Sequence, residues 1–408
     1  MTQDPLIIRK TYLNRLRQYQ NKDFIKVITG IRRCGKSSLM RLFIDELLQT
    51  GVPEENIIHF NFEVVQYEGI SNYHLLYDTL MDRMPASGRA YIFLDEIQHV
   101  EAWEKAVNSI RVETDADIYI TGSNAWLLSS EIATLLSGRY VEIPMLPLSF
   151  REYLDFGTFP AEWGNREKFD RYLQYGGFPG VSSLPQENEP VNGFLQGIYN
   201  TVIVKDVLSR HALHDVKMFD QLVKFLCQNT GNLVSPSNIA GFLSSQGKTE
   251  SVKSATVSRY LDLLEKAYIV YPAHRYDIKG KELLKTLSKY YVVDTGIRNM
   301  LLGYSNTDLG YVIETVVFFE LLRRGFQVFT GKYYAREVDF CAVKQDRKIY
   351  YQVTLTMMDE AVRERELNPL MAIKDNYEKV ILSMDKTYVT DYEGIKYQNI
   401  IDFLLGEW

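Results

Sequence analysis

The sequence predicts an α/β protein whose N-terminal part is built on a parallel β-sheet, and three observations lead to this fold class. Short apolar runs alternate with helical segments over residues 24–145. Such alternation is typical of parallel strands joined by helical crossovers that cover both faces of a sheet. A glycine-containing loop at residues 30–37 follows the first apolar run, and the run at residues 91–96 ends in two carboxylates.

The composition is that of a globular protein with a sizeable core. Of the 408 residues, 46% are hydrophobic and 24% are charged, which suggests two or three domains and argues against extended disorder. The formal net charge of −6 argues against a uniformly basic, nucleic-acid-coating surface. It leaves room for one local basic patch.

Cysteine spacing and hydropathy indicate the compartment. The three cysteines, Cys34, Cys227 and Cys341, are far apart and form no CxxC pair, so the sequence supports neither a disulfide framework nor a zinc knuckle. Reduced thiols fit a cytoplasmic protein. Because we find no apolar leader and no long apolar run, we expect no membrane partner.

Three domains are expected along the chain. The alternating region ends at a glycine-rich turn, residues 176–180, so the first domain is placed at residues 1–180. Residues 181–300 contain two helices followed by two strands with a basic loop, and this order describes a winged helix. Residues 301–408 are expected to form a third, small α/β domain.

The loop at residues 30–37 matches the phosphate-binding pattern GxxxxGK[ST] at every fixed position. It follows an expected strand and begins an expected helix, which is the context that this motif requires. Lys36 should reach the β- and γ-phosphates of ATP, and Ser37 should ligate Mg²⁺. The alternative without a binding function is a glycine turn with a surface lysine. The expected ATP-binding residues are Gly30, Arg33, Cys34, Gly35, Lys36, Ser37 and Ser38.

Asp95 and Glu96 end an apolar strand and should therefore lie at the carboxyl edge of the sheet, where ligands bind. We expect Asp95 to hold Mg²⁺ through water and Glu96 to deprotonate the attacking water. Without other motifs nearby, two carboxylates at this position could simply be the solvated end of a strand. Downstream of a phosphate-binding loop, the catalytic interpretation is favoured.

Two further catalytic residues are expected. Asn124 follows the next strand and could lie between the attacking water and the γ-phosphate. Ser123 is the alternative for this role. Either residue could instead be a helix N-cap with only a structural role. Arg139 begins the last strand and could neutralise charge on the transferred phosphate, in the same chain or in a second copy. A surface arginine is the alternative.

Five segments together resemble a known family. They read GIRRCGKSSLM, FLDEIQ, TGSNAWLLSSEIATLLSGRY, PLSFREYL and GGFP, and they are similar to segments of bacterial and archaeal AAA-family P-loop ATPases with a C-terminal domain of unknown function, the DUF4143 group. The resemblance implies an AAA+/ASCE P-loop NTPase sheet of strand order 5-1-4-3-2. It further implies a winged helix and a restriction-endonuclease-like domain of the PD-(D/E)XK type.

The nuclease pattern that this resemblance implies is incomplete. It requires an acid on the first helix, an Asp on the second strand and an acid-x-Lys on the third. Glu314 suits the helix, and Glu337 and Asp339 suit the strand. The third position contains Gln352 and Thr354, which provide neither the metal-binding acid nor the lysine. We therefore expect a degenerate nuclease fold that does not cleave DNA.

A set of basic residues in the expected winged helix could contact DNA phosphates, a protein partner or only solvent. These residues are Lys253, Arg259, Lys266, His274, Arg275, Lys279, Lys281, Lys285 and Lys289.

Three functions remain open at this stage. The first is an Mg²⁺-dependent ATPase whose turnover rearranges the C-terminal domains. The second is a slow ATP-gated switch that binds DNA or a protein partner. The third is an ATP-dependent nuclease, against which Gln352 and Thr354 argue. A homo-oligomer is left open.

Overall fold

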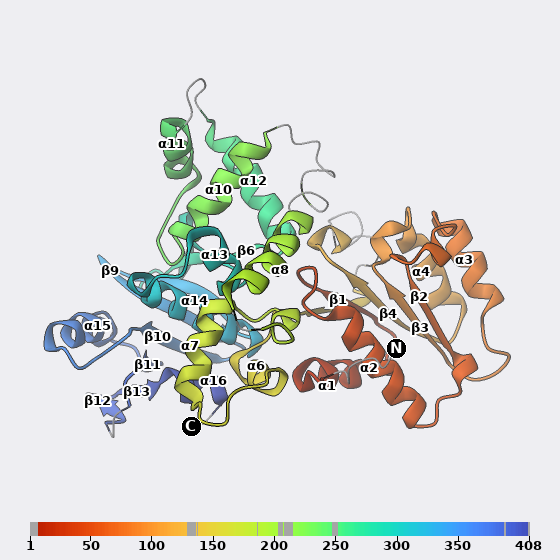
Figure 1. The fold of residues 1–408 in the computed structure, drawn as a ribbon, viewed down its shortest axis with the longest axis horizontal. Coiled ribbons are helices and arrows are strands. Elements are labelled where there is room, and N and C mark those ends of the chain that lie inside the picture. Colours follow the sequence, from red (N-terminus) through yellow and green to blue (C-terminus); the bar gives the residue numbers. More distant parts are fainter. Residues whose placement is uncertain are drawn as a thin grey trace. The chain divides into compact units, whose positions relative to one another are not determined.

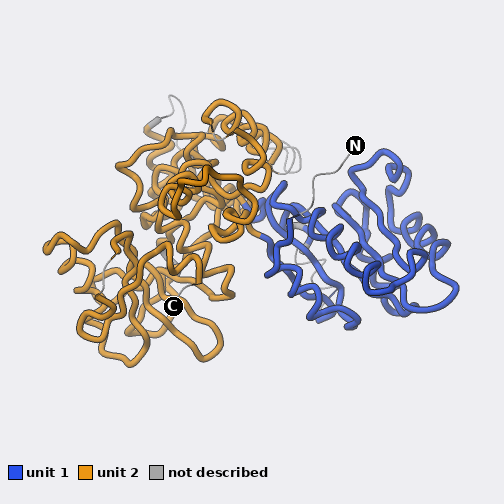
Figure 2. Tube along the Cα trace, turned by 60° about the horizontal axis from the view of Figure 1, so that its bottom comes forward, with its two compact units in different colours: residues 1–145, 266–268 blue, residues 146–265, 269–408 orange. Residues whose placement is uncertain are grey.

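The computed structural model describes residues 7–128, 136, 138–185, 187–202, 207, 215–246, 252–386 and 389–406. The chain divides into two compact units (Figures 1 and 2), which consist of residues 1–145 with 266–268 and of residues 146–265 with 269–408. The first unit ends before the glycine turn at which the sequence places the first boundary. The division into three domains stays a prediction.

The first unit is built on a five-stranded sheet in which all paired neighbours are parallel. Its strand order is β2-β3-β4-β1-β5, so the strand order that the resemblance implied is confirmed. The first strand along the chain lies inside the sheet, and its carboxyl end leads into the glycine-containing loop. The strands are β1 (Ile25–Thr29), β2 (Ile57–Asn61), β3 (Ala90–Asp95), β4 (Ala116–Gly122) and β5 (Tyr140–Pro144).

Alternating side chains along β3 explain why helices cover both faces of this sheet. Ile92 and Leu94 belong to a buried cluster that includes Trp103 of α4. Phe93 lies between them in sequence, points to the other face and packs against Phe43 of α2 with a centroid distance of 6.3 Å. The helices of this unit are α1 (Lys10–Tyr19), α2 (Lys36–Gln49), α3 (Tyr73–Asp82) and α4 (Trp103–Glu113), with short 3₁₀ turns η1 (Glu54–Asn56), η2 (Val65–Tyr67), η3 (Ile97–His99) and η4 (Ala125–Leu128).

The second unit begins with a run of helices. Its first helix is capped by Ser149 and Glu152, each of which accepts a side-chain hydrogen bond from the other's backbone N–H; this capping box satisfies two donors at the helix N-terminus. The helical elements are α6 (Phe150–Phe156), α7 (Asn165–Tyr175), η5 (Pro179–Val181), α8 (Asn188–Thr201), α10 (Val216–Gln228), α11 (Pro236–Gln246), α12 (Ser254–Lys266), α13 (Thr295–Leu302) and η7 (Asn306–Asp308).

The glycine turn after α7 is a buried packing contact within the second unit. Gly176 has a φ of +80°, which favours glycine. The N–H of Gly177 donates to Asp294 Oδ2 at 2.6 Å. A Cβ on Gly177 would lie 2.5 Å from the carbonyl oxygen of Leu148. Both glycines are therefore needed for this close approach.

The second sheet has eight strands in the order β12-β13-β11-β10-β9-β8-β6-β7. The β6–β7 hairpin joins it because β6 pairs in parallel with β8. Strands predicted for the helical domain therefore share a sheet with strands of the C-terminal domain. The strands are β6 (Val270–Asp277), β7 (Glu282–Val292), β8 (Gln327–Tyr333), β9 (Arg336–Lys344), β10 (Arg347–Val353), β11 (Glu378–Ser383), β12 (Asp391–Tyr392) and β13 (Ile395–Asn399).

The chain that forms the C-terminal part of this sheet runs through α14, β8, β9, β10, α15 and β11 in that order (Figure 1). Strands β8, β9 and β10 are antiparallel neighbours, and β11 pairs in parallel with β10. Upstream, a single antiparallel bridge joins Val234, in the segment between α10 and α11, to Ser288 of β7. The helices of this part are α14 (Leu309–Arg323), α15 (Glu360–Ala372) and α16 (Ile400–Leu405).

Candidate nucleotide-binding site

The phosphate-binding loop connects the carboxyl end of β1 to the first turn of α2. Gly35 is the N-cap of α2 and has a φ of 105°. Gly30 has a φ of +141°, and a Cβ there would lie 2.1 Å from the carbonyl oxygen of Met145. Two backbone positions thus require glycine, and the loop places the N–H groups at the start of α2 where an anion can bind.

Lys36 is buried at the centre of this loop, with 4% of its surface exposed. Its Nζ donates to the carbonyl oxygens of Gly30 at 3.0 Å and Ile31 at 3.3 Å. It also lies 3.7 Å from Glu96 Oε1. The ammonium group is therefore held inside the loop, beside the carboxylate predicted to act on water.

The other predicted loop residues differ in exposure. Cys34 is buried, Ser37 is half-buried, and Arg33 and Ser38 are exposed. Arg33 has a φ of +65°. Burial raises the pKa of the Cys34 thiol despite the nearby Lys36 ammonium, so this cysteine stays a neutral core residue of the loop.

Two arginines that the sequence analysis did not single out also contact the loop region. Arg9, at the N-cap of α1, donates to the carbonyl oxygen of Cys34 at 3.0 Å and supports the loop from within the unit. Arg32 forms an ion pair with Glu63, just after β2. Neither contact has a sequence motif that would have revealed it.

Asp95 is 1% exposed at the end of β3. Its Oδ1 accepts a hydrogen bond from Thr121 Oγ1 at 2.5 Å, and its Oδ2 accepts one from Asn61 Nδ2 at 3.3 Å. These partners end the neighbouring strands β4 and β2, so three strand ends together fix the carboxylate. The described residues contain no group of three His, Cys, Asp or Glu side chains that could hold a metal.

Glu96 adopts a left-handed backbone conformation, with φ 55° and ψ 46°, which is uncommon outside glycine and often marks functional sites. Its N–H donates to Thr121 Oγ1 at 2.9 Å, and its Oε2 accepts a hydrogen bond from Gln98 Nε2. Burial raises the pKa of Glu96, but the Lys36 ammonium and the Gln98 hydrogen bond outweigh it, so the pKa lies below its usual value. The carboxylate is therefore ionised at neutral pH.

The predicted residues after β4 are buried and lack hydrogen-bond partners among the described residues. Asn124 is 0% exposed, and neither its Oδ1 nor its Nδ2 is paired. The Ser123 hydroxyl makes no hydrogen bond of ordinary geometry, although it lies close enough to Glu96 to lower the pKa of that carboxyl. Because buried polar groups are rarely left unpaired, both are candidates to contact water or ligand.

Arg139 directly precedes β5, as the sequence predicted, but it lies away from the phosphate-binding loop of its own chain. Its carbonyl oxygen accepts a hydrogen bond from the N–H of Ile25, at the amino end of β1, whereas the phosphate-binding loop follows the carboxyl end. The length of β1, roughly 15 Å, thus separates the two. The exposed Arg139 side chain donates to Asn108 of α4 at 3.1 Å. This position does not support a contact between Arg139 and a nucleotide bound by the same chain.

The acidic residues predicted from the nuclease pattern do come together in the second unit, but around a lysine. Lys289 Nζ of β7 lies 2.9 Å from Glu314 of α14, 2.9 Å from Glu337 and 3.5 Å from Asp339 of β9. Lys289 is 2% exposed, so its side chain is not available for contact with DNA phosphates. The alternation of β7 explains this, because Lys289 shares a face with the buried Tyr291, whose hydroxyl donates to Glu314 Oε1 at 2.6 Å.

Gln352 and Thr354 are both buried, and Gln352 contacts a member of this cluster. Gln352 Oε1 accepts from the N–H of Asp339 at 3.3 Å, and its Nε2 donates to Glu366 of α15 at 2.8 Å. Burial and the neighbouring Glu314 raise the pKa of Asp339 to about 7. Both polar ends of the glutamine side chain are thus used within the protein, and Glu366 is a member of the network that sequence reasoning missed.

The remaining basic residues predicted for DNA contact differ in position. Lys253, Arg259, His274, Lys279 and Lys281 are exposed. Arg275 and Lys266 are half-buried. The Lys285 side chain lies outside the described residues.

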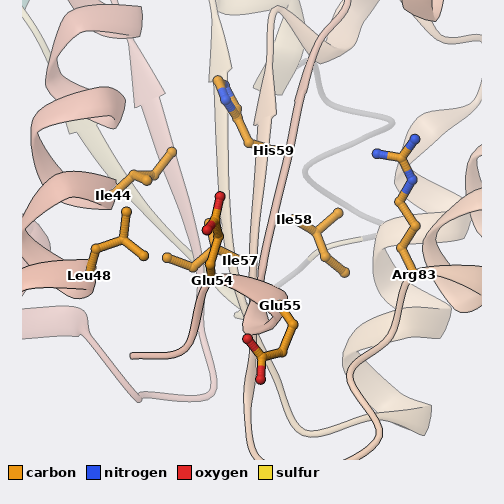
Figure 3. A pocket seen from close by; sticks show the side chains of 8 residues that line it. All are labelled: Ile44, Leu48, Glu54, Glu55, Ile57, Ile58, His59 and Arg83. Atoms are coloured by element: carbon orange, nitrogen blue, oxygen red, sulfur yellow. The ribbon is translucent and has the colours of Figure 1, made fainter. Parts of the chain in front are cut away.

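A separate cavity of about 460 Å³ lies at the edge strand β2 (Figure 3). None of the predicted site residues lines it, so this cavity is distinct from the loop and carboxylate site. Its lining residues are Ile44, Leu48, Glu54, Glu55, Ile57, Ile58, His59 and Arg83.

Family comparisons agree with this geometry in the first unit. Residues 22–154 match the family described as AAA domain. Residues 166–308 match a domain of unknown function, DUF8612. The DUF4143 domain expected at residues 301–408 stays a prediction. No described helix has the length and apolar character needed to cross a membrane.

Relatives from two domains of life align along most of the chain. An uncharacterized protein of Haemophilus influenzae is 41% identical over 403 residues, covering 98% of this chain and 99% of the relative. An uncharacterized protein of Methanocaldococcus jannaschii is 31% identical over 369 residues, covering 86% and 79%. Among solved structures, a Walker-type ATPase of Pyrococcus abyssi is similar with a TM-score of 0.46 and 16% identity, covering 72% of this chain and 95% of that one.

The parallel sheet, the phosphate-binding loop and the AAA family match together define an AAA-type P-loop ATPase domain. The chain belongs to the family of these uncharacterized relatives from Haemophilus influenzae and Methanocaldococcus jannaschii.

Proposed function

We propose that the chain is an Mg²⁺-dependent ATPase that hydrolyses ATP to ADP and phosphate at the loop between β1 and α2. The contact of 3.7 Å between Lys36 Nζ and Glu96 Oε1 is the observation that carries this proposal. It brings the phosphate-binding cation and an ionised, buried carboxylate to one point. A γ-phosphate bound by Lys36 would therefore lie beside the group that accepts a proton from water.

Each residue of the site has a role in this proposal. Lys36 exchanges its loop carbonyl partners for phosphate oxygens, and the N–H groups at the start of α2 bind the remaining phosphate charge. Ser37 and Asp95 would hold Mg²⁺, which would supply charge neutralisation on the phosphates. Glu96 accepts the proton of the attacking water. Asn124, with two unpaired buried polar atoms, orients that water.

The C-terminal domains are proposed to respond to the nucleotide. In this proposal, hydrolysis changes their position, and the alternative is a slow switch whose ATP-bound form binds DNA or a protein. The order α10, Val234 bridge, α11, α12, β6–β7 supports a winged helix. The exposed Lys279 and Lys281 on its hairpin loop support contact with nucleic-acid phosphates.

The segment from α14 to β11 is proposed to be a PD-(D/E)XK-like domain that does not cleave DNA. The order and direction of its elements support that fold. The ammonium group of Lys289 already lies among the three acids, and Gln352 is engaged with Asp339 and Glu366. Binding without cleavage, in the cytoplasm, is the role proposed for these domains.

Phosphate release by the purified full chain tests the proposal. Release should occur with ATP and Mg²⁺ and stop when EDTA removes the metal. Substitution of GTP for ATP then measures the base preference. No release above the buffer blank at any ATP concentration, from protein that binds ATP, would support the switch alternative instead.

A further inference from the structure

Gln98 is the residue in closest polar contact with the proposed catalytic carboxylate, and no motif function accounts for it. It lies in the short turn η3, two residues after Glu96. Its Nε2 donates to Glu96 Oε2. Its own side chain is half-buried, so the hydrogen bond is largely shielded from solvent.

The other end of the same amide is unpaired. Gln98 Oε1 is buried and has no hydrogen-bond partner among the described residues. The unpaired side-chain atoms of Ser123 and Asn124 follow β4 in the same part of the unit. A buried carbonyl oxygen without a donor destabilises the protein, so a donor is expected in the working state.

Gly122 makes room for this amide at the carboxyl end of β4. A Cβ at Gly122 would lie 3.1 Å from Gln98 Oε1 and 2.6 Å from Leu127 Cδ2. The unpaired oxygen therefore lies at the end of β4, beside the residue that precedes Ser123 and Asn124 in the sequence. An attacking water would have to lie near Glu96 and near the end of β4. At that position it could donate a hydrogen bond to Gln98 Oε1.

We propose that Gln98 positions both Glu96 and the attacking water, with Nε2 fixing the carboxylate and Oε1 accepting a hydrogen bond from the water. This inference rests on the proposed ATPase function and adds to it a residue that orients both the carboxylate of Glu96 and the water. Because Oε2 of Glu96 is held by Gln98, Oε1 is the oxygen that accepts the proton.

The chemical step is balanced without any further reactant. The water oxygen forms a bond to the γ-phosphorus, and the bond from that phosphorus to the β–γ bridging oxygen breaks. The electron pair leaves with ADP. One water proton passes to Glu96 Oε1, and Glu96 later returns it to solvent. Gln98 neither gains nor loses a proton and is a positioning residue.

The test compares Gln98→Leu with Gln98→Glu in the full chain, by steady-state phosphate release from pH 5 to 9. Gln98→Leu should lower kcat by about tenfold, the low end of a general-base contribution, with ATP affinity within twofold of wild type. Loss of the hydrogen bond should raise the pKa of Glu96 and move the acidic limb of the kcat profile to higher pH.

Gln98→Glu keeps the size and the acceptor oxygen but places a second carboxylate beside Glu96. Repulsion between the two should move the acidic limb further than in Gln98→Leu. Gln49→Leu, at the exposed end of α2, is the matched control and should behave as wild type. ATP affinity and circular dichroism report whether each variant is folded.

Three results would overturn the inference. One is wild-type kcat in folded Gln98→Leu while Glu96→Gln is slow, which would leave the ATPase proposal intact. The second is a reduced kcat with an unmoved acidic limb in both Gln98 variants, which would show that Gln98 does not act through Glu96. The third is absence of turnover in the wild type, in which case the ATPase proposal fails first.

Discussion

Lys36 Nζ and Glu96 Oε1 lie 3.7 Å apart, although the two residues follow different strands, β1 and β3. Both side chains are buried, with exposed fractions of 3% and 7%. The strand β4 lies between β1 and β3 in the sheet, so the contact spans the end of a strand. The loop geometry and the left-handed turn at Glu96 together make this approach possible.

Replacement of Lys36 by Ala should abolish ATP binding and leave the fold intact. The ammonium is buried in the loop, 3.7 Å from Glu96 Oε1, and its loss removes the charge that is predicted to meet the β- and γ-phosphates. Equilibrium binding of labelled ATP measures this. Lys10→Ala, on the exposed side of α1, is the control, and unchanged ATP affinity in folded Lys36→Ala would refute the site.

Arg139→Ala should leave kcat unchanged in dilute, monomeric protein, because Arg139 lies at the amino edge of the sheet and contacts Asn108. If copies associate so that Arg139 reaches a neighbour's nucleotide, wild-type turnover per chain should rise with protein concentration. Adding Lys36→Ala protein to Arg139→Ala protein should then restore activity. Turnover across a hundredfold dilution decides this, and an equal loss at every concentration would contradict the position described above.

The pH dependence of stability should report on the acidic cluster. Burial and the neighbouring Glu314 raise the pKa of Asp339 to about 7 from the usual 3.8. The folded protein thus binds a proton that the unfolded chain lacks between these values, and this contribution stabilises the fold at low pH and is lost as pH rises to about 7. In Asp339→Asn the free energy of unfolding should vary less from pH 4 to 7.

Denaturant unfolding at each pH measures that slope. Asp294→Asn is the comparison in the same unit, because burial raises the pKa of Asp294 to about 6 at a site distant in sequence. Asp294→Asn should reduce the change in the free energy of unfolding over a different part of the pH range. The same slope in wild type and Asp339→Asn would mean that Asp339 does not titrate in this range.

The purified protein should not cleave DNA with Mg²⁺ or Mn²⁺, with or without ATP. A metal among Glu314, Glu337 and Asp339 would have to displace the Lys289 ammonium, and Gln352 offers only a neutral oxygen. The assay uses single-stranded, duplex and branched DNA beside Asp339→Ala. Cleavage that disappears in Asp339→Ala would show a working nuclease site.

The sequence predicted the sheet and the core of the nucleotide site because these depend on local patterns. The loop at residues 30–37 has fixed residues within eight positions, and β3 ends directly in Asp95 and Glu96. The partners that hold these carboxylates could not be predicted in the same way. Thr121 and Asn61 reach Asp95 from separate strands, and only the strand order brings them together.

For two residues the sequence contains a signal for the position that the structure shows. Arg139 precedes its strand, so a parallel sheet puts it at the amino edge, away from the ligand edge. Lys289 alternates with Tyr291, an aromatic residue suited to a buried face. Asn124 was predicted from its position after β4. The role proposed for Gln98 could not be predicted in this way, because it depends on an unpaired polar atom, which no sequence pattern records.

Comparison of Glu96→Gln with the wild type tests the central claim most directly, by ATP affinity and steady-state phosphate release with Mg²⁺. The amide keeps the size of the side chain but cannot accept the proton of water. We predict unchanged ATP affinity and a kcat at least about tenfold lower than wild type. Wild-type turnover in folded Glu96→Gln would contradict it.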